Sequence, residues 1–268
     1  MFDYHIHTHH SFDGFHSMEE LTKRAISLGL QKICFTDHKD YDYDGEGNDF
    51  TFSYESFFEE INEIAHKYRK EITVLSGVEF GLQPFVNEKY IQDAASHPFD
   101  FIIGSLHSVH KTDIFTGDYF ESRSQQEAYH DYFNDMLQVI QNDTPFSVLG
   151  HMDMIKRYGG YSETLPLNDY QEVATVIFKE LIERGKGIEV NTSGFRYGLE
   201  DTHPSFDLLK LYYEVGGEII VPGSDTHRID ELAFRFRETF KVLHSIGYRF
   251  IASYSNMEPA FHRIEKYL

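Results

Sequence analysis

The N-terminal stretch Phe2-Asp3-Tyr4-His5-Ile6-His7-Thr8 has the pattern of a short β-strand and carries two histidines. Because side chains alternate between the two faces of a strand, His5 and His7 point to the same side. Two imidazoles in this arrangement can bind one divalent metal ion. The motif is weak evidence by itself, since such pairs arise by chance in a chain that contains 16 histidines.

A strand-like run that ends in a metal-ligand residue recurs along the chain. The further instances are Thr36-Asp37-His38, Gly77-Val78-Glu79, Gly104-Ser105-Leu106-His107, Leu149-Gly150-His151-Met152-Asp153 and Gly223-Ser224-Asp225-Thr226-His227. A purely structural role is a reasonable interpretation of any one of these residues. A shared metal site explains the whole set better, because six histidines, Glu79 and Asp225 all occupy equivalent positions.

Helical patterns separate these runs, and one of them opens with the capping box Ser17-Met18-Glu19-Glu20. The predicted strands are residues 2–8, 32–36, 72–80, 99–106, 146–149, 187–191 and 218–222, with one more strand-like run at 249–254. The predicted helices are residues 17–29, 53–68, 124–141, 168–184, 205–215 and 230–245. The chain therefore alternates strands and helices in seven or eight units.

This alternation predicts an α/β fold, either a closed parallel barrel or an open doubly wound sheet. In a barrel the carboxyl ends of all strands meet at one mouth, whereas the outer strands of an open sheet lie too far apart to share a site. The candidate ligands follow strands along the whole chain, which favours the barrel. No linker is visible, so we expect residues 1–268 to form a single domain.

Composition excludes several classes of function. The formal net charge of −20 argues against a nucleic-acid-binding surface, which needs a basic face. The single cysteine, Cys34, excludes an intramolecular disulfide. The chain begins without a signal-peptide pattern and contains no run long enough to span a membrane, so we expect a cytoplasmic protein without a membrane partner.

The types of candidate ligand indicate the metal and the chemistry. Imidazoles and carboxylates without thiolates suit zinc, manganese or iron. Glu79 stands centrally among the histidines and is the natural bridge between two ions. Such a pair can deprotonate a bridging water at neutral pH and clamp the attacking and leaving oxygens of an in-line displacement. The ligand set therefore predicts a hydrolase, with phosphate esters as the leading class of substrate.

The stretch His5-x-His7-Thr8-x-x-Ser11-x-Asp13-Gly14 and the motifs above resemble the polymerase and histidinol phosphatase (PHP) superfamily, from residue 3 to about residue 228. The resemblance implies a distorted, TIM-like (β/α)7 barrel with two or three divalent metal ions. The implied ligands are His5, His7, Glu79 and Asp225 for the first ion, Glu79, His107 and His151 for the second, and Asp13, His38 and His227 for the third. Many members of the superfamily carry histidine where this chain has Asp13, and a carboxylate is a competent replacement.

Looser patterns at residues 150–158, 188–196 and 209–217 are similar to the stand-alone histidinol phosphatase branch of the superfamily. This likeness implies that the protein converts L-histidinol phosphate and water to L-histidinol and phosphate, in histidine biosynthesis. The hydroxide bridging the first two metals would attack phosphorus. Asp225 is then a plausible acceptor of its proton, and Glu79 and Asp225 are the expected catalytic carboxylates.

A phosphate monoester also needs cationic side chains beyond the metals. Arg157 and Arg196 lie on strand-end loops and are the expected phosphate clamps, counted with the catalytic residues. Asp42, in the acidic loop 40–44, and His110 are candidate contacts for the remainder of the substrate. A solvated, flexible loop is an equally good interpretation of residues 40–44.

Three other functions stay open from the sequence. The first is a phosphoesterase of the same superfamily that acts on nucleotides or oligonucleotides, which a basic groove would favour. The second is a non-catalytic metal-binding accessory domain, for which eroded ligands would be typical. A phosphatase of phosphotyrosyl proteins is the third. The filled ligand motifs and the negative charge favour a small phosphorylated metabolite as substrate, and the sequence does not determine an oligomeric state.

Overall fold

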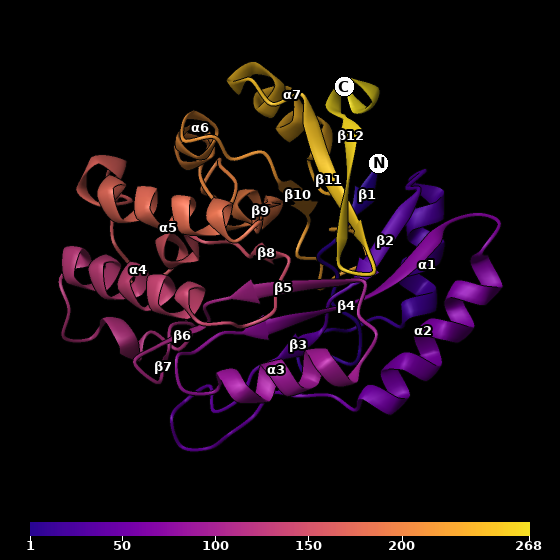
Figure 1. Ribbon diagram of the computed structural model, residues 1–268, viewed down its shortest axis with the longest axis horizontal. Helices are drawn as coiled ribbons and strands as arrows, with labels where there is room; N and C mark the ends of the chain where they lie inside the picture. The colour runs from indigo at the N-terminus through magenta and orange to yellow at the C-terminus, as the bar shows by residue number, and fades with distance from the viewer.

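The structure, a computed structural model, describes residues 1–268 as a barrel of parallel strands surrounded by helices (Figure 1). The strands of the wall, in order, are β1 (Phe2–Asp3), β2 (Lys32–Phe35), β4 (Thr73–Gly81), β5 (Phe101–Ser105), β8 (Val148–Leu149), β9 (Gly187–Asn191) and β10 (Ile220–Gly223). Each strand is parallel to its neighbours. The short β3 (His38–Lys39) also pairs with β4, which sets His38 beside Glu79.

The two ends of this strand order approach each other and nearly close the barrel. The backbone N–H of Tyr4 donates to the carbonyl of Pro222 at 3.1 Å. Farther along, Ile6 forms a parallel bridge with Thr226, and the N–H of His7 donates to the Thr226 carbonyl at 2.8 Å. The predicted parallel α/β barrel of seven strands is therefore confirmed.

Helices cover the outside of the barrel (Figure 1). They are α1 (Met18–Ser27), α2 (Tyr54–Tyr68), α3 (Asn87–Ser96), α4 (Gln125–Gln141), α5 (Gln171–Glu183), α6 (Phe206–Glu214) and α7 (Phe236–Ile246). The predicted capping box of α1 is confirmed, because the Ser17 hydroxyl accepts from the Glu20 N–H and the Glu20 carboxylate accepts from the Ser17 N–H. None of the helices combines the length and apolarity needed to cross a bilayer. The cytoplasmic location stays a prediction.

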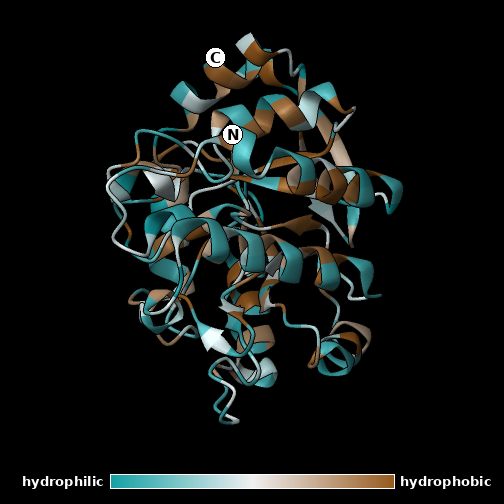
Figure 2. Ribbon diagram, turned by 90° about the vertical axis from the view of Figure 1, so that its left-hand side faces the viewer, coloured by the Kyte–Doolittle hydropathy of each residue, from teal (hydrophilic) through white to brown (hydrophobic).

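The strands are buried on both faces, as parallel strands covered by helices require. All five residues of β5 are buried, and so are Ile33, Cys34 and Phe35 of β2. The buried hydrophobic residues form one contiguous cluster of 67 side chains. The division of the chain into a single domain stays a prediction. Figure 2 shows hydrophilic residues along the outer faces of several helices.

The last strand-like run does not extend the barrel. β11 (Phe250–Ser255) pairs antiparallel with β12 (Glu258–Arg263), and this hairpin lies near the N-terminus (Figure 1). The Tyr4 hydroxyl donates to the Tyr254 carbonyl at 2.7 Å, and the rings of Phe101 and Tyr254 pack at 5.2 Å. The hairpin thus covers the end of the barrel at which the strands begin, opposite the mouth.

Several short elements belong to the loops at the mouth. They are the hairpin of β6 (Ser108–Val109) and β7 (Thr112–Asp113) and the 3-10 turns η1 (Asp118–Phe120), η2 (Met154–Arg157), η3 (Leu167–Asp169) and η4 (Thr192–Tyr197). A further 3-10 turn, η5 (Ile264–Tyr267), follows β12 and ends the chain. Neither these nor α3 follow from the sequence patterns. In α3 only Tyr90 is buried and no side chain caps the N-terminus, so no apolar periodicity marks it.

The closure of the barrel depends on the buried carboxylate of Asp3. It accepts hydrogen bonds from the Ser224 N–H at 2.9 Å, the Ser224 hydroxyl at 2.6 Å and the Ala233 N–H at 2.9 Å. We expect Asp3→Ala to lower the free energy of unfolding by about 2–4 kcal/mol, because these donors lose a charged acceptor inside the protein. Urea denaturation at fixed metal concentration measures the change.

Asp230→Ala is the matched control, because the Asp230 side chain is 75% exposed and its nearest ion-pair partner is 3.7 Å away. This substitution should change the stability by less than about 0.5 kcal/mol. Equal stabilities of the two variants would contradict the role given to Asp3.

Candidate active site

A cavity of about 410 Å³ opens at the mouth of the barrel, where the strands end. Six of the nine predicted metal ligands line it, namely Asp13, His38, His107, His151, Asp225 and His227. The other three, His5, His7 and Glu79, are fully buried beside them. The structure therefore brings together all nine residues that the sequence predicts as ligands.

The Glu79 carboxylate lies at the centre of this group and has no exposed surface. Five imidazoles surround its oxygens, with N···O distances of 3.3 Å for His5, 3.5 Å for His7, 3.1 Å for His38, 3.3 Å for His107 and 2.8 Å for His151. The Ser105 hydroxyl donates to Oε1 at 2.6 Å, while Oε2 has no hydrogen-bond partner. Such a two-sided carboxylate can be shared between two ions.

The ligand atoms fall into small overlapping groups whose members lie within 4.8 Å of one another. The groups are His5, His7 and Asp225; His5, Glu79 and His151; His38, Glu79 and His107; and His7, Asp13, His38 and His227. The implied partition into three sites stays a prediction. In the structure His5 reaches two groups and His7 joins the group of Asp13. The residues implied for the second ion are divided, because His151 groups with His5 and His107 groups with His38.

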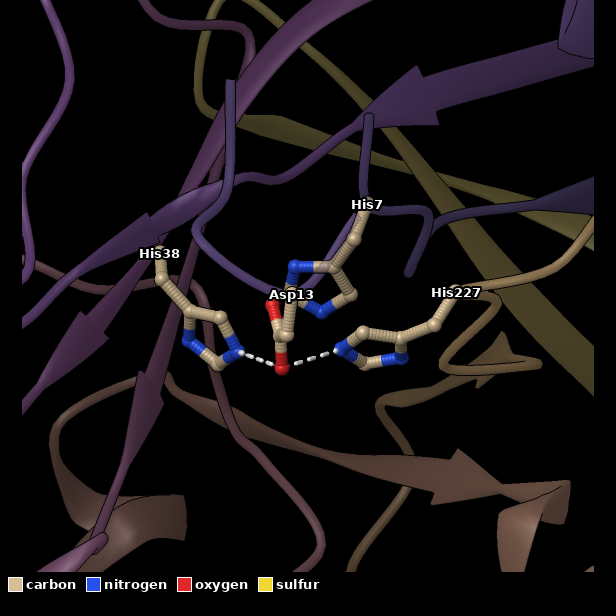
Figure 3. Close-up of side chains that lie close together, drawn as sticks. All are labelled: His7, Asp13, His38 and His227. Carbon is tan, nitrogen blue, oxygen red and sulfur yellow. Dashed lines mark ion pairs between the residues drawn. The ribbon is translucent and has the colours of Figure 1, made fainter. Parts of the chain in front are cut away.

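Figure 3 shows the group around Asp13. One oxygen of Asp13 lies 3.0 Å from His227 Nε2 and 3.7 Å from His38 Nε2, and its other oxygen is buried without a hydrogen-bond partner. The ring of His7 is stacked against both histidines, at 4.1 Å from His227 and 4.3 Å from His38.

Hydrogen bonds define which imidazole nitrogens are free to bind a metal. His5 Nδ1 donates to the Glu189 carboxylate at 2.6 Å. His7 Nδ1 donates to the Ser11 oxygen at 3.0 Å, because the Ser11 hydroxyl itself donates to Asp37. In the neutral rings each Nε2 atom then carries an unprotonated lone pair. The Nε2 atoms of His5 and His7 face each other at 3.0 Å. Two facing lone pairs repel each other, and a cation between them removes this repulsion, so these residues fit a metal.

The charges at the centre support the same conclusion. Six imidazoles are combined with the carboxylates of Glu79, Asp225, Asp13, Asp40 and Glu189. Burial opposes protonation of His107, yet the neighbouring Asp40 and Glu79 carboxylates raise its pKa to about 10. An environment that draws protons onto a buried imidazole equally favours a divalent cation.

Two carboxylates that the sequence analysis did not select orient these histidines. Asp40 accepts from His107 Nδ1 at 2.6 Å and lies 3.3 Å from His38 Nδ1. Glu189 binds His5 Nδ1 with one oxygen and accepts the His151 N–H at 2.9 Å with the other. Their signal in the sequence is a charged residue at a buried strand position, as in Gly187-Ile188-Glu189-Val190-Asn191.

The two predicted phosphate clamps lie differently. Arg157 lines the cavity, with its guanidinium 3.4 Å from the ring centre of Tyr197 and its buried Nε without a hydrogen-bond partner. Arg196 is not among the lining residues. It donates to the carbonyls of Ser224 and Asp225, both at 2.7 Å. A substrate contact of Arg196 stays a prediction.

The predicted contacts Asp42 and His110 also lie outside the lining of the cavity. Asp42 accepts from the Gly47 N–H at 2.7 Å within its own loop, and His110 pairs with Asp135 at 3.2 Å. A substrate contact of either residue stays a prediction. Asp113, on β7 next to this region, lines the cavity instead.

Aromatic side chains form much of the remaining wall. Phe12, Phe50 and Tyr43 make a stack with centroid distances of 4.0 Å at both steps. Phe115 and Tyr158 contribute from other loops. Loop aromatics carry no periodic signal, so the sequence analysis selected none of them individually.

The orienting role of Asp40 can be tested directly. Asp40→Asn removes the charge that holds His107 and His38, and we expect the affinity of the protein for zinc to fall about 10- to 100-fold. Metal content after dialysis against zinc buffers measures this. Asp42→Asn is the control, because Asp42 contacts neither histidine, and it should keep the metal content of the wild type. An unchanged zinc affinity in Asp40→Asn would refute the role.

Comparisons with known proteins agree with this geometry. Residues 3–193 match the model of the PHP domain. The histidinol-phosphatase of Lactococcus lactis is 29% identical over 258 residues, which cover 96% of this chain and 95% of the relative. A probable histidinol-phosphatase of Clostridium acetobutylicum is 30% identical over 273 residues, covering 100% of this chain and 99% of the relative.

Solved structures show the same fold. The crystal structure of histidinol phosphate phosphatase from Lactococcus lactis, in complex with zinc, L-histidinol and phosphate, superposes with a TM-score of 0.90 at 28% identity. It covers 97% of this chain and 98% of that one. The structure of a protein described as a histidinol phosphatase from Listeria monocytogenes has a TM-score of 0.76 at 19% identity, over 89% of this chain and 99% of that one.

Proposed function

Because the chain belongs to the PHP domain family, we propose that it is a metal-dependent phosphatase that hydrolyses L-histidinol phosphate to L-histidinol and phosphate. The observation that carries the proposal is the buried Glu79 carboxylate with five imidazoles around it, at the base of a cavity of metabolite size. The likeness to histidinol-phosphatases over nearly the whole chain supports the choice of substrate.

The proposed ligands are the nine residues grouped around Glu79, holding two or three ions. Their nitrogen and oxygen donors suit zinc, manganese or iron, and the relative from Lactococcus lactis binds zinc. When bound, such ions polarise phosphoryl oxygens, lower the pKa of water and hold the reacting groups for in-line displacement.

We propose that the Asp225 carboxylate accepts the proton of the attacking hydroxide. Its carboxylate lies 3.5 Å from His7 and 3.6 Å from His5, and it also lines the cavity. Its backbone has a φ of 55°, a left-handed conformation that is costly for a non-glycine residue. The Arg196 guanidinium, bonded to the carbonyls of Ser224 and Asp225, stabilises this conformation and so positions the carboxylate.

Arg157 is the proposed phosphate clamp. Stacking on Tyr197 fixes the plane of its guanidinium, and its free Nε–H remains available for a phosphoryl oxygen. The attraction between this fixed positive charge and the phosphoryl oxygens strengthens as the oxygens gain negative charge in the transition state, and such a gain accelerates the reaction.

The part of the cavity wall that is formed by aromatic side chains and Asp113 suits the organic half of the substrate. Histidinol has an imidazole ring and an ammonium group, which need aromatic faces and a carboxylate. Phe12, Phe50, Tyr43 and Phe115 offer the first, and Asp113 offers the second. Burial raises the pKa of Asp113 above its usual value, and a cationic ligand beside it would lower that pKa again.

A phosphate-release screen of the metal-loaded protein tests this function. We expect kcat/KM for L-histidinol phosphate to exceed that for p-nitrophenyl phosphate, nucleoside monophosphates and a phosphotyrosine peptide by about 100-fold or more, because only the first fills the aromatic and acidic half of the cavity. Glu79→Gln, purified identically, is the control for contaminating phosphatases and should be inactive.

A higher kcat/KM for nucleotides than for L-histidinol phosphate would identify the protein as a nucleotide phosphoesterase. Absence of turnover with every phosphate ester would favour a metal-binding accessory domain. Either result would overturn the proposed function.

A further inference from the structure

A second cluster of metal-ligand side chains lies outside the cavity, between the loop that follows β1 and helix α2. It consists of His9 and His10, in the turn after Thr8, and Glu60 in the middle of α2. None of the three lines the cavity. We propose that His9, His10 and Glu60 form a peripheral site for one divalent transition-metal ion of the zinc class, separate from the ions around Glu79.

The distances fit such an ion. Glu60 Oε2 lies 2.9 Å from His10 Nε2 and 3.4 Å from His9 Nε2, and the three ligand atoms all lie within 4.8 Å of one another. Ligand bonds of about 2.0–2.2 Å in a tetrahedral shell place neighbouring donors about 3.3–3.6 Å apart. The two distances from Glu60 Oε2 to the imidazole nitrogens are therefore close to those of a tetrahedral metal site.

Two of the three ligands are already fixed. Glu60 Oε1 accepts from the Met18 N–H, the first of α1, at 3.2 Å, which aims Oε2 at the histidines. The ring of His10 packs against Phe57 at 5.6 Å, and its backbone N–H donates to the Thr8 hydroxyl at 3.1 Å. Preorganised ligands lose little entropy when they bind, which favours affinity.

The third ligand gives access from solvent. The His9 side chain is 49% exposed, whereas that of His10 is 9% exposed. Both ion-pair partners of Glu60 are imidazoles, which bind a metal in the neutral form. The exposed side leaves room for water or a further ligand, so the site suits reversible binding.

Occupancy of this site would act on the loop that supports the active site. The His9 N–H donates to the His16 carbonyl at 2.9 Å and closes residues 9–16 into one loop. That loop carries Ser11, which holds His7, and Asp13, which faces His227. An ion between His9, His10 and Glu60 would tie the loop to α2 and stabilise it against unfolding.

The experiment uses the holoenzyme, with its tight sites filled, equilibrated against zinc buffers of increasing free concentration. Metal content per chain should rise by one further, weaker equivalent in the wild type, accompanied by an increase of Tm. His9→Ala and Glu60→Gln should lose this equivalent and the Tm increase, while phosphate release stays at the wild-type level.

His16→Ala is the matched control, because it replaces a histidine of the same loop that lies 4.0 Å from its only acidic neighbour, Glu20. It should retain the weaker ion. Equal zinc uptake by the wild type, His9→Ala and Glu60→Gln would overturn the proposal, and so would loss of the ion in His16→Ala. Retained phosphate release in the two cluster variants separates this site from the proposed catalytic centre.

Discussion

The buried charge of Glu79 is the constraint on which the rest of the structure depends. Burying a carboxylate is expensive unless cations or hydrogen bonds surround it. Burial acts to raise the pKa of Glu79, but His5, His107 and His38 lower it well below the usual value, so the carboxylate is ionised. Five imidazoles surround this charge. Because they are also the proposed metal ligands, metal binding is coupled to the stability of the barrel mouth.

The barrel supplies these imidazoles because it joins distant parts of the chain. Closure between β1 and β10 brings the His5–His7 pair beside Asp225, although the two segments are about 220 residues apart. Close contacts between strands are possible only with small residues. A Cβ on Gly81 would lie 1.8 Å from the Asp40 carboxylate that orients His107, so glycine is required there.

Much of this could be predicted from the sequence, since strand ends and ligand residues leave a one-dimensional pattern. The seven strands and eight of the nine residues around Glu79 follow from it, whereas Asp13 was expected only from the resemblance to the PHP superfamily. Glu189 and Asp40 were missed because their task is to orient histidines, which only three-dimensional contacts reveal. The partners of Arg196 and Asp42 were missed for a related reason. Arg196 binds backbone carbonyls and Asp42 binds a backbone N–H, and every residue type offers such backbone groups. The sequence pattern predicts β11 as a strand, but nothing in its residues indicates that it pairs with β12 and covers the barrel instead of joining the wall.

The central claim is that the two oxygens of Glu79 are shared between two metal ions. Anomalous diffraction at the zinc absorption edge, from crystals grown with zinc, tests it most directly. The account predicts two strong peaks, one beside each oxygen of Glu79, with His5, His7 and Asp225 around one and His107 and His151 around the other. A map with no zinc within about 2.5 Å of either Glu79 oxygen would contradict it.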